Sequence, residues 1–255
     1  MAGLYNKFQK RQASFMAACQ EYIEMLWYYE KKDGAKAIAY SILLLLAITM
    51  SIILIPGQLL WRIVATALCL LLLFFTKQKF SSVGLSFVNI WPSLRLGLIW
   101  GLVFFFFIIP LAQPYASLDF PHRTLPIMLE RVMSLPLGSL VYVVLAALFL
   151  SLWEEILFRG YLQTRLHGLI RSNFWAVLVG GIFFAIIHLP TDLTNPAIRS
   201  MPFGGWHIFR YSSIVVMHFI LNHIYRRHNN LAGAILLHHI ISIRNWIFHA
   251  DVLGV

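Results

Sequence analysis

Long apolar segments follow one another along most of this chain, and they limit what it can fold into. They run over residues 37–55, 58–76, 94–112, 138–162, 174–190, 207–225 and 230–249. Each is close to the roughly 20 residues that an α-helix needs to cross a bilayer. Lipid offers the backbone no hydrogen-bond partners, so helices, which satisfy their own backbone groups, are expected. The sequence therefore predicts an all-α fold, a polytopic membrane bundle of about seven transmembrane helices.

The composition agrees with a chain surrounded by lipid. Hydrophobic residues make up 60% of the sequence and charged residues only 12%, whereas a soluble domain has about 25% charged residues. The formal net charge is +10, but the sequence has no zinc-finger spacing, no glycine-rich phosphate loop and no basic stripe interleaved with aromatic residues. We therefore expect membrane lipid, and no nucleic acid, among its partners.

The basic residues predict the orientation of the chain in the membrane. If the N-terminus is cytoplasmic, most basic residues of the connections fall on the cytoplasmic side, and only Arg123, Arg131 and Arg199 clearly fall on the other. Cytoplasmic connections of membrane proteins carry an excess of lysine and arginine. The pattern predicts a cytoplasmic N-terminus and fits a bacterial inner (plasma) membrane.

The chain divides into three regions. Residues 1–36 form a cytoplasmic segment whose apolar residues recur at helical spacing, which predicts an amphipathic helix on the membrane surface. Residues 37–137 hold the first transmembrane helices and a long connection, and residues 138–250 hold the remaining spans. Gly97 and Gly101 are four residues apart in the third span, which predicts a close contact with another helix.

Ionisable side chains inside the spans are the main candidates for function, because each charge there costs about 2.5–3.5 kcal/mol on insertion scales. They form three groups: Glu154, Glu155 and Arg159 in one span, His188 in the next, and His238 with Ser242 in a later one. Glu155 and Arg159 are four residues apart and can pair on one helix face. Glu154 points about 100° away and has no partner in its own helix. Each group alone has a structural explanation, but that explanation leaves Glu154 unaccounted for.

The order of these groups resembles the CAAX-protease and bacteriocin-processing family (CPBP, or Abi), which includes the type II CAAX endopeptidases. The matching residues are Glu154-Glu155-x-x-x-Arg159, Phe184-x-x-x-His188 and His238-x-x-x-Ser242. The resemblance covers roughly residues 138–245 and implies that residues 138–250 form the catalytic core of an intramembrane protease. The implied substrate is a membrane-associated peptide, such as a prenylated C-terminus or a leader peptide. The family usually has Asn at the position of Ser242, and Asn222 and Asn245 are nearby alternatives.

The chemistry of peptide hydrolysis suggests a role for each of these residues. A carboxylate that is removed from water becomes a stronger base, which suits Glu154 to activating a water molecule. His188 could hold the same water and move its proton. His238 and Ser242 could donate hydrogen bonds to the oxyanion. Glu155 and Arg159 would then orient Glu154, and the resemblance implies the same roles, with Phe184 as a supporting residue.

Several alternatives stay open at this point. Glu154, His188 and His238 could instead hold a catalytic zinc ion, as two histidines and a glutamate do in some metalloproteases. The sequence has no His-Glu-x-x-His motif, so a glutamic mechanism without a cofactor is the favoured hypothesis. The other classes are a non-proteolytic family member, such as an immunity or scaffold protein, a proton-coupled transporter, and a haem protein with ligands such as His218.

Overall fold

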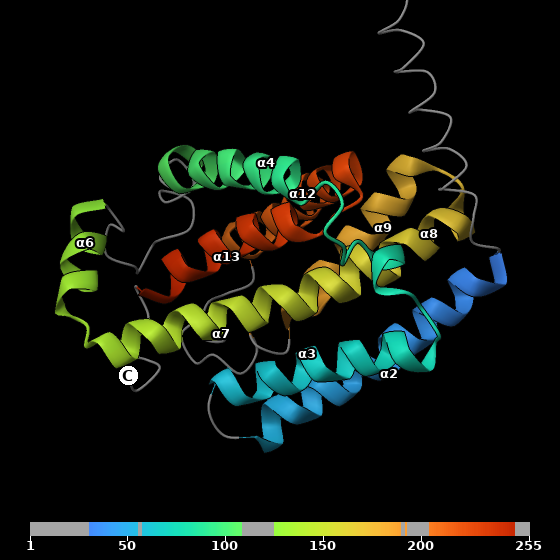
Figure 1. The fold of residues 1–255 in the computed structure, drawn as a ribbon, viewed down its shortest axis with the longest axis horizontal. Helices are drawn as coiled ribbons and strands as arrows, with labels where there is room; N and C mark the ends of the chain where they lie inside the picture. The colour runs from blue at the N-terminus through green and yellow to red at the C-terminus, as the bar shows by residue number, and fades with distance from the viewer. Residues whose placement is uncertain (1–30, 56–57, 109–124, 190–191, 193–203, 248–255) are drawn as a thin grey trace, which may run out of the picture.

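The computed structural model describes residues 31–55, 58–108, 125–189, 192 and 204–247, and its regular elements are all helices (Figure 1). The long elements are α2 (Lys31–Leu54), α3 (Gln58–Phe75), α4 (Ile90–Val103), α6 (Leu125–Ser134), α7 (Leu137–Glu155), α8 (Gln163–Ile170), α9 (Asn173–Ile186), α12 (Gly205–His228) and α13 (Ala232–Ile247). The short ones are η1 (Phe80–Val83), a 3₁₀-helix, and η2 (Phe104–Ile108) and η3 (Ile156–Leu162), both π-helices. The predicted all-α class is confirmed for this part of the chain. Of the segment 1–36 predicted as an amphipathic helix, residues 1–30 lie outside the described residues, and residues 31–36 belong to α2.

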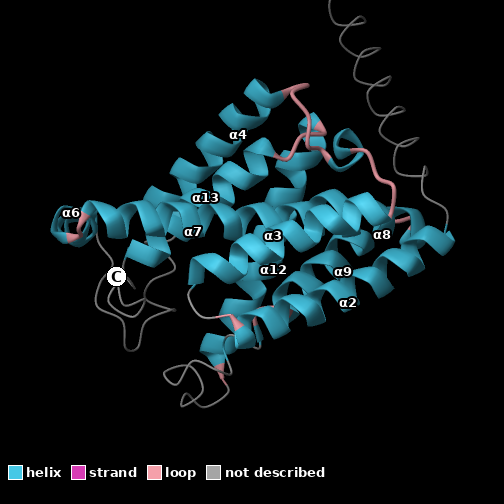
Figure 2. Ribbon diagram, turned by 60° about the horizontal axis from the view of Figure 1, so that its bottom comes forward, coloured by secondary structure: helices cyan, strands magenta, loops and turns pink. Residues whose placement is uncertain are grey.

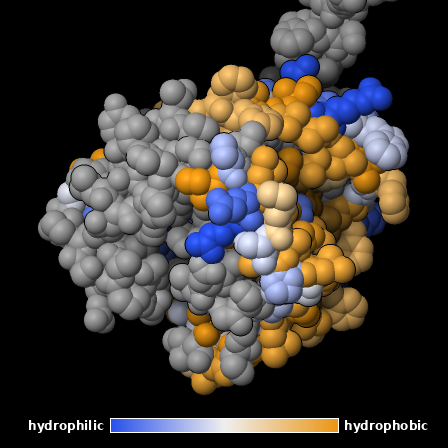
Figure 3. Space-filling model, turned by 90° about the vertical axis from the view of Figure 1, so that its left-hand side faces the viewer, coloured by the Kyte–Doolittle hydropathy of each residue, from blue (hydrophilic) through white to orange (hydrophobic). Residues whose placement is uncertain are grey.

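Each of the seven predicted spans corresponds to a helix. Three stretches are long and apolar enough to cross a membrane, Asp33–Ile52, Ile90–Ile108 and Leu137–Ile170, and α3 and α9 are shorter apolar helices. Large apolar side chains such as Phe74, Phe75 and Leu43 are exposed, as a lipid environment requires. In Figure 3, the part of one face that the structure describes is mostly apolar, with hydrophilic groups near its centre and at its upper edge. The chain is an integral membrane protein, and the number of seven spans stays a prediction.

The structure extends two of the predicted elements. The long connection predicted between the third and fourth spans contains α6, at one end of the bundle. The span predicted to end at residue 162 continues through η3 and α8 to Ile170. The polar residues near position 162 suggested that the span ends there. In the structure, however, Arg159, Gln163 and Arg165 are buried inside the protein. The helix ends only at Arg171, which adopts a left-handed conformation with φ of 54°.

The N-terminal hairpin packs against the helix that carries the two glutamates. Figure 1 shows α2 and α3 side by side, with α3 next to α7, and α3 contacts both helices. Figure 2 shows the same helices from another side. The hydroxyl of Thr66 donates to the carbonyl of Phe149 at 3.2 Å, and the thiol of Cys69 lies 3.6 Å from the carbonyl oxygen of Trp153. The hairpin is therefore joined to the catalytic core predicted from the sequence.

Helix α13, which carries His238, lies between α4 and α7 (Figure 1). A Cβ added to Gly97 of α4 would lie 2.7 Å from the Cα of Gly233 in α13, and a Cβ on Gly101 would reach the side chain of Ile240. Real Cβ atoms do not approach other atoms so closely, so only glycine lets the two backbones meet here. The close contact predicted from Gly97 and Gly101 is confirmed.

Replacing Gly97 with alanine should therefore destabilise the protein by forcing α4 away from α13. We expect Gly97→Ala to lower the free energy of unfolding by about 1–3 kcal/mol, the usual cost of overpacking. Thermal unfolding of the purified protein in detergent measures this. Gly138→Ala is the matched control, because a Cβ at Gly138 meets nothing within 4 Å. Equal stability of the two variants would show that the α4–α13 contact can relax without cost.

Candidate active site

The two glutamates lie at the end of α7, where the helix widens into the π-helix η3. Insertions of this kind are rare and frequently occur at functional sites. Glu154 is 4% exposed, and Glu155 and Arg159 are fully buried. Nη1 of Arg159 donates to Oε1 of Glu155 at 2.9 Å, the pairing that their four-residue spacing predicts. The charge of Glu155 is thus neutralised within its own helix, whereas the ionisable group near Glu154 comes from another helix.

His238 of α13 lies between the two carboxylates. Its Nδ1 is 2.8 Å from Oε1 of Glu155, and its Nε2 is 3.6 Å from Oε2 of Glu154. A carboxylate only accepts hydrogen bonds, so Nδ1 carries the proton that is donated to Glu155. The Nε2 of the neutral ring is then an acceptor directed toward Glu154. This is the feature of the site that the sequence did not predict.

Phe184 is the common neighbour of the other predicted residues. Its ring centroid lies 4.1 Å from the guanidinium carbon of Arg159, a cation–π contact. Ring centroids of His188 and His238 lie 5.3 and 6.2 Å from it, and that of Phe158 lies 5.0 Å away. Phe184 therefore fixes the positions of side chains from three helix segments, which explains the role of an aromatic residue at the start of the Phe-x-x-x-His motif.

His188 joins the site through Phe184. Its Nδ1 is 2.8 Å from the carbonyl oxygen of Phe184, which can only accept, so Nδ1 donates and the Nε2 of neutral His188 is an acceptor. Ser242 is buried one turn from His238 on α13. Its hydroxyl makes no hydrogen bond to Glu154 or Glu155 in the described part of the chain. Of the predicted residues, Ser242 is the one that the structure does not join to the others.

The predicted zinc ligands do not form a three-ligand site. Among the described residues, no three His, Cys, Asp or Glu side chains are grouped closely enough to hold a metal ion. Glu154 and His238 lie together, whereas the ring nitrogen Nδ1 of His188 bonds to the backbone carbonyl of Phe184. The arrangement of these donors does not fit the zinc hypothesis.

Two groups of charged residues near the site did not figure in the sequence prediction. Arg62 lies inside the second predicted span and is buried against the rings of Trp61 and Trp246. Arg210 of α12 makes two hydrogen bonds of 2.7 Å to the carboxylate of Asp192. The backbone N–H of Asp192 donates to the carbonyl of His188, so this pair ties the end of α9 to α12. A charged residue within or beside a predicted span is the sequence signal that would have identified Arg62 and the Arg210–Asp192 pair.

A second group of buried, hydrogen-bonded polar side chains lies next to Phe184, whose ring centroid is 5.8 Å from that of His218. Nε2 of His218 donates to Oε1 of Gln163 at 2.8 Å, and the amide of Gln163 lies 3.2 Å from Nε2 of His167. Gly180 leaves room for this group, because a Cβ there would lie 2.9 Å from Nε2 of His218. The Nε2 of His218, considered above as a haem ligand, is thus engaged in a hydrogen bond. These hydrogen bonds connect α12 to α8.

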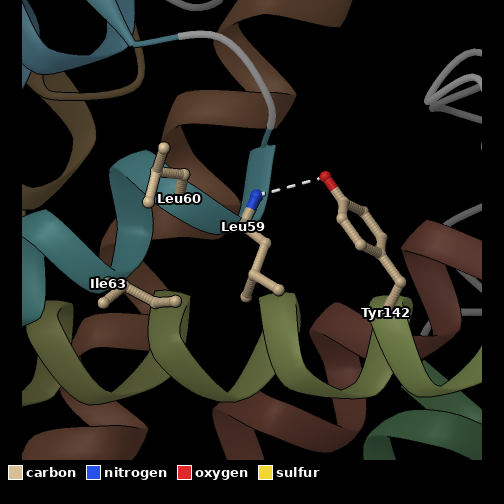
Figure 4. A pocket seen from close by; sticks show the side chains of 4 residues that line it. All are labelled: Leu59, Leu60, Ile63 and Tyr142. Carbon is tan, nitrogen blue, oxygen red and sulfur yellow. Dashed lines mark hydrogen bonds between the residues drawn. The ribbon is translucent and has the colours of Figure 1, made fainter.

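An open apolar groove of about 280 Å³ lies at the start of α3, away from the carboxylates. Leu59, Leu60, Ile63 and Tyr142 line it, and Figure 4 shows the side chain of Tyr142, which carries the one polar side-chain group among these four residues. That group, the Tyr142 hydroxyl, already accepts the backbone N–H of Leu59 at 3.2 Å. The groove has the character of a lipid-facing furrow and not of a reaction site.

Comparison with known families agrees with the motifs. Residues 136–243 match the family model described as type II CAAX prenyl endopeptidase Rce1-like, and the match contains all three motifs. Neither the curated proteins nor the solved structures gave a match. The family implies protease activity on peptide or protein substrates in a membrane. Over residues 136–243, this chain is similar to the Rce1-like family of type II CAAX prenyl endopeptidases, which supports the resemblance expected from the motifs.

Proposed function

We propose that this protein is an intramembrane endopeptidase in which Glu154 activates a water molecule to attack a peptide bond. The observation that supports this most strongly is the position of His238, anchored to Glu155 at 2.8 Å with its other nitrogen 3.6 Å from Glu154. The family match supports the reaction class. The substrate would be a membrane-associated peptide, either prenylated at its C-terminus or carrying a leader segment.

The separation of Glu154 and His238 suits a bridging water. At 3.6 Å the two atoms are too far apart for a good direct hydrogen bond. A water oxygen about 2.8 Å from each would be in hydrogen-bond contact with both. Glu154 then takes a proton from this water as the oxygen forms its bond to the substrate carbonyl carbon. The second hydrogen of the water is donated to the neutral Nε2 of His238, which is an acceptor.

The proton must then reach the leaving amine. Nε2 of His238 can receive it from Glu154, and the resulting imidazolium is stabilised by the Glu155 carboxylate at Nδ1. The protonated Nε2 donates to the departing nitrogen as the peptide C–N bond breaks. The role of His238 in this proposal differs from the oxyanion role expected from sequence, because neutral His238 has its only N–H directed at Glu155. The Ser242 hydroxyl remains the proposed oxyanion donor.

The test is cleavage by the purified wild-type protein in lipid vesicles, with peptides anchored in the same bilayer as substrates. Mass spectrometry should show one peptide bond hydrolysed, and Glu154→Gln is the matched inactive control. We expect chelators to remove little activity, because the donors are not arranged as a metal site. Full loss on chelation that zinc reverses would refute the metal-free mechanism. A wild-type protein as inactive as the control would favour the non-proteolytic alternative.

The basic residues support a cytoplasmic N-terminus as part of this proposal. In that orientation the carboxylates, at the end of α7, lie toward the cytoplasmic half of the membrane. A substrate tail in the cytoplasm would then reach the site without crossing the bilayer. The proposed setting is the plasma membrane of a bacterial cell.

A further inference from the structure

His188 lies beyond the regular part of its helix. Helix α9 ends at Ile186, and residues 187 and 188 form a turn. The backbone N–H of His188 donates to the carbonyl of Ala185 at 3.1 Å, a bond that spans three residues instead of the four of an α-helix. Pro190 follows in the sequence, and a proline has no N–H with which to continue a helix. The helix alone therefore does not fix the position of this histidine.

Two further hydrogen bonds hold His188, one through its ring and one through its backbone. Its Nδ1 donates to the carbonyl of Phe184 at 2.8 Å, which fixes the direction of the ring. Its own carbonyl accepts the backbone N–H of Asp192 at 3.0 Å. The position of His188 therefore depends on where Asp192 is held.

Asp192 is held by helix α12. Its carboxylate accepts two hydrogen bonds of 2.7 Å from Nε and Nη2 of Arg210, and one of 3.2 Å from the hydroxyl of Tyr211. The side chain of Asp192 is 3% exposed and that of Arg210 is 32% exposed. A bidentate pair fixes direction as well as distance. Since α12 also packs directly against α9, this Asp192–Arg210 pair fixes the segment after α9 relative to a neighbouring helix.

The ring of His188 is placed against the residue that the other site residues share. Its centroid lies 5.3 Å from that of Phe184, whose ring also contacts His238 and Arg159. A shift of about 1 Å in a catalytic group can lower a rate about 100-fold. The bonds that hold His188 therefore matter for more than the stability of the turn.

We propose that Asp192 and Arg210 are positioning residues that hold His188 in the active site. The pair connects the backbone of His188 to α12, and so replaces the helical bonds that end with α9. This role rests on the proposed function, in which the site around Phe184 and Glu154 hydrolyses a peptide bond. Arg210 acts through His188 and is not required to touch the substrate.

The experiment compares wild type, Arg210→Met, His188→Ala and the double variant, each as the full chain in vesicles, with kcat and KM measured on an anchored peptide. We expect kcat to fall about tenfold in Arg210→Met with little change in KM, because a misplaced group slows the reaction without weakening binding. In His188→Ala we expect a fall of about 100-fold. Because Arg210 acts through His188, the double variant should be no slower than His188→Ala.

Several results would overturn the proposal. A tenfold fall in both backgrounds would show that Arg210 acts independently of His188. An unchanged kcat in Arg210→Met would remove the role altogether, and a rise in KM alone would indicate contact with the substrate. Arg227→Met is the matched control, because Arg227 is an exposed arginine on the same helix, and its kcat should equal that of wild type. If Arg210→Met does not accumulate, Asp192→Asn weakens the same pair with a side chain of equal size and carries the same expectations.

A second measurement does not depend on catalysis. The ¹⁵N chemical shifts of an imidazole report which nitrogen carries the proton, and the signal that is lost in His188→Ala identifies His188. When the ring is neutral, wild type should show protonated Nδ1, and Arg210→Met should show a mixture of the two tautomers. An unchanged signal in Arg210→Met would overturn the proposal. If Glu154→Gln retains full activity, the proposed function is wrong, and the tautomer of His188 still decides whether the Asp192–Arg210 pair positions it.

Discussion

Replacing Glu154 with glutamine should slow cleavage by about 1,000-fold, within the range that general base catalysis contributes. The amide has nearly the same size as the carboxylate but cannot take a proton from water. Oε2 of Glu154 has no hydrogen-bond partner among the described residues, and Nε2 of His238 lies 3.6 Å from it. The substitution therefore breaks few contacts. We expect the variant to accumulate to the wild-type level.

The measurement is the initial rate of cleavage in vesicles, normalised to folded protein determined by gel filtration in detergent. Glu130→Gln is a suitable control, because Glu130 is exposed on α6 and should be neutral in this assay. A Glu154→Gln protein that is folded and fully active would remove this carboxylate from the mechanism. A variant that fails to fold would instead show that the charge of Glu154 is needed for structure.

Replacing Glu155 with glutamine should affect folding and rate together. Glu155 pairs with fully buried Arg159 and also accepts the hydrogen bond from His238. Without the carboxylate, Arg159 loses its ion-pair partner, and breaking one side of a buried pair costs about 3–5 kcal/mol. His238 also loses the charge that stabilises its protonated form. We expect a strong fall in folded protein and a lower kcat in the fraction that remains.

A double variant separates these two effects. Combining Arg159→Met with Glu155→Gln removes both charges. The apolar side chain of the methionine can pack against the Phe184 ring that Arg159 covers. Thermal unfolding and cleavage are measured on both variants. The double variant should recover most of the folded protein but little of the activity. Recovery of both, or of neither, would contradict the two roles assigned to Glu155.

The sequence was sufficient to predict the helices and the motif residues, because apolar length and spacing along one helix follow from the order of residues. Glu155 and Arg159 pair as their spacing predicts, and Gly97 meets another helix as expected. What spacing cannot predict is the rotation of one helix against another. Whether Nδ1 of His238 faces Glu155 or Glu154 depends on how α13 sits against α7, and only the packed structure contains that information.

Two omissions have identifiable causes. Arg62 was overlooked because the apolar residues around it make residues 58–76 read as an ordinary span. Its neighbour Trp246 is far from it in the sequence, so the contact could not be predicted. Arg210 and Asp192 were overlooked because their pairing crosses from the end of α9 to α12. In both cases the unusual residue was visible in the sequence, while its partner was not.

The number of residues in the π-helix η3 determines how the helix beyond it is oriented toward the rest of the core. Each residue added to or removed from a continuous helix turns everything beyond it by about 100°. Between Glu155 and Gln163, a deletion would leave the carboxylates in place but swing Gln163 and His167 away from His218. All seven residues of this segment are also buried, so both its length and its side chains are constrained by the packing around it.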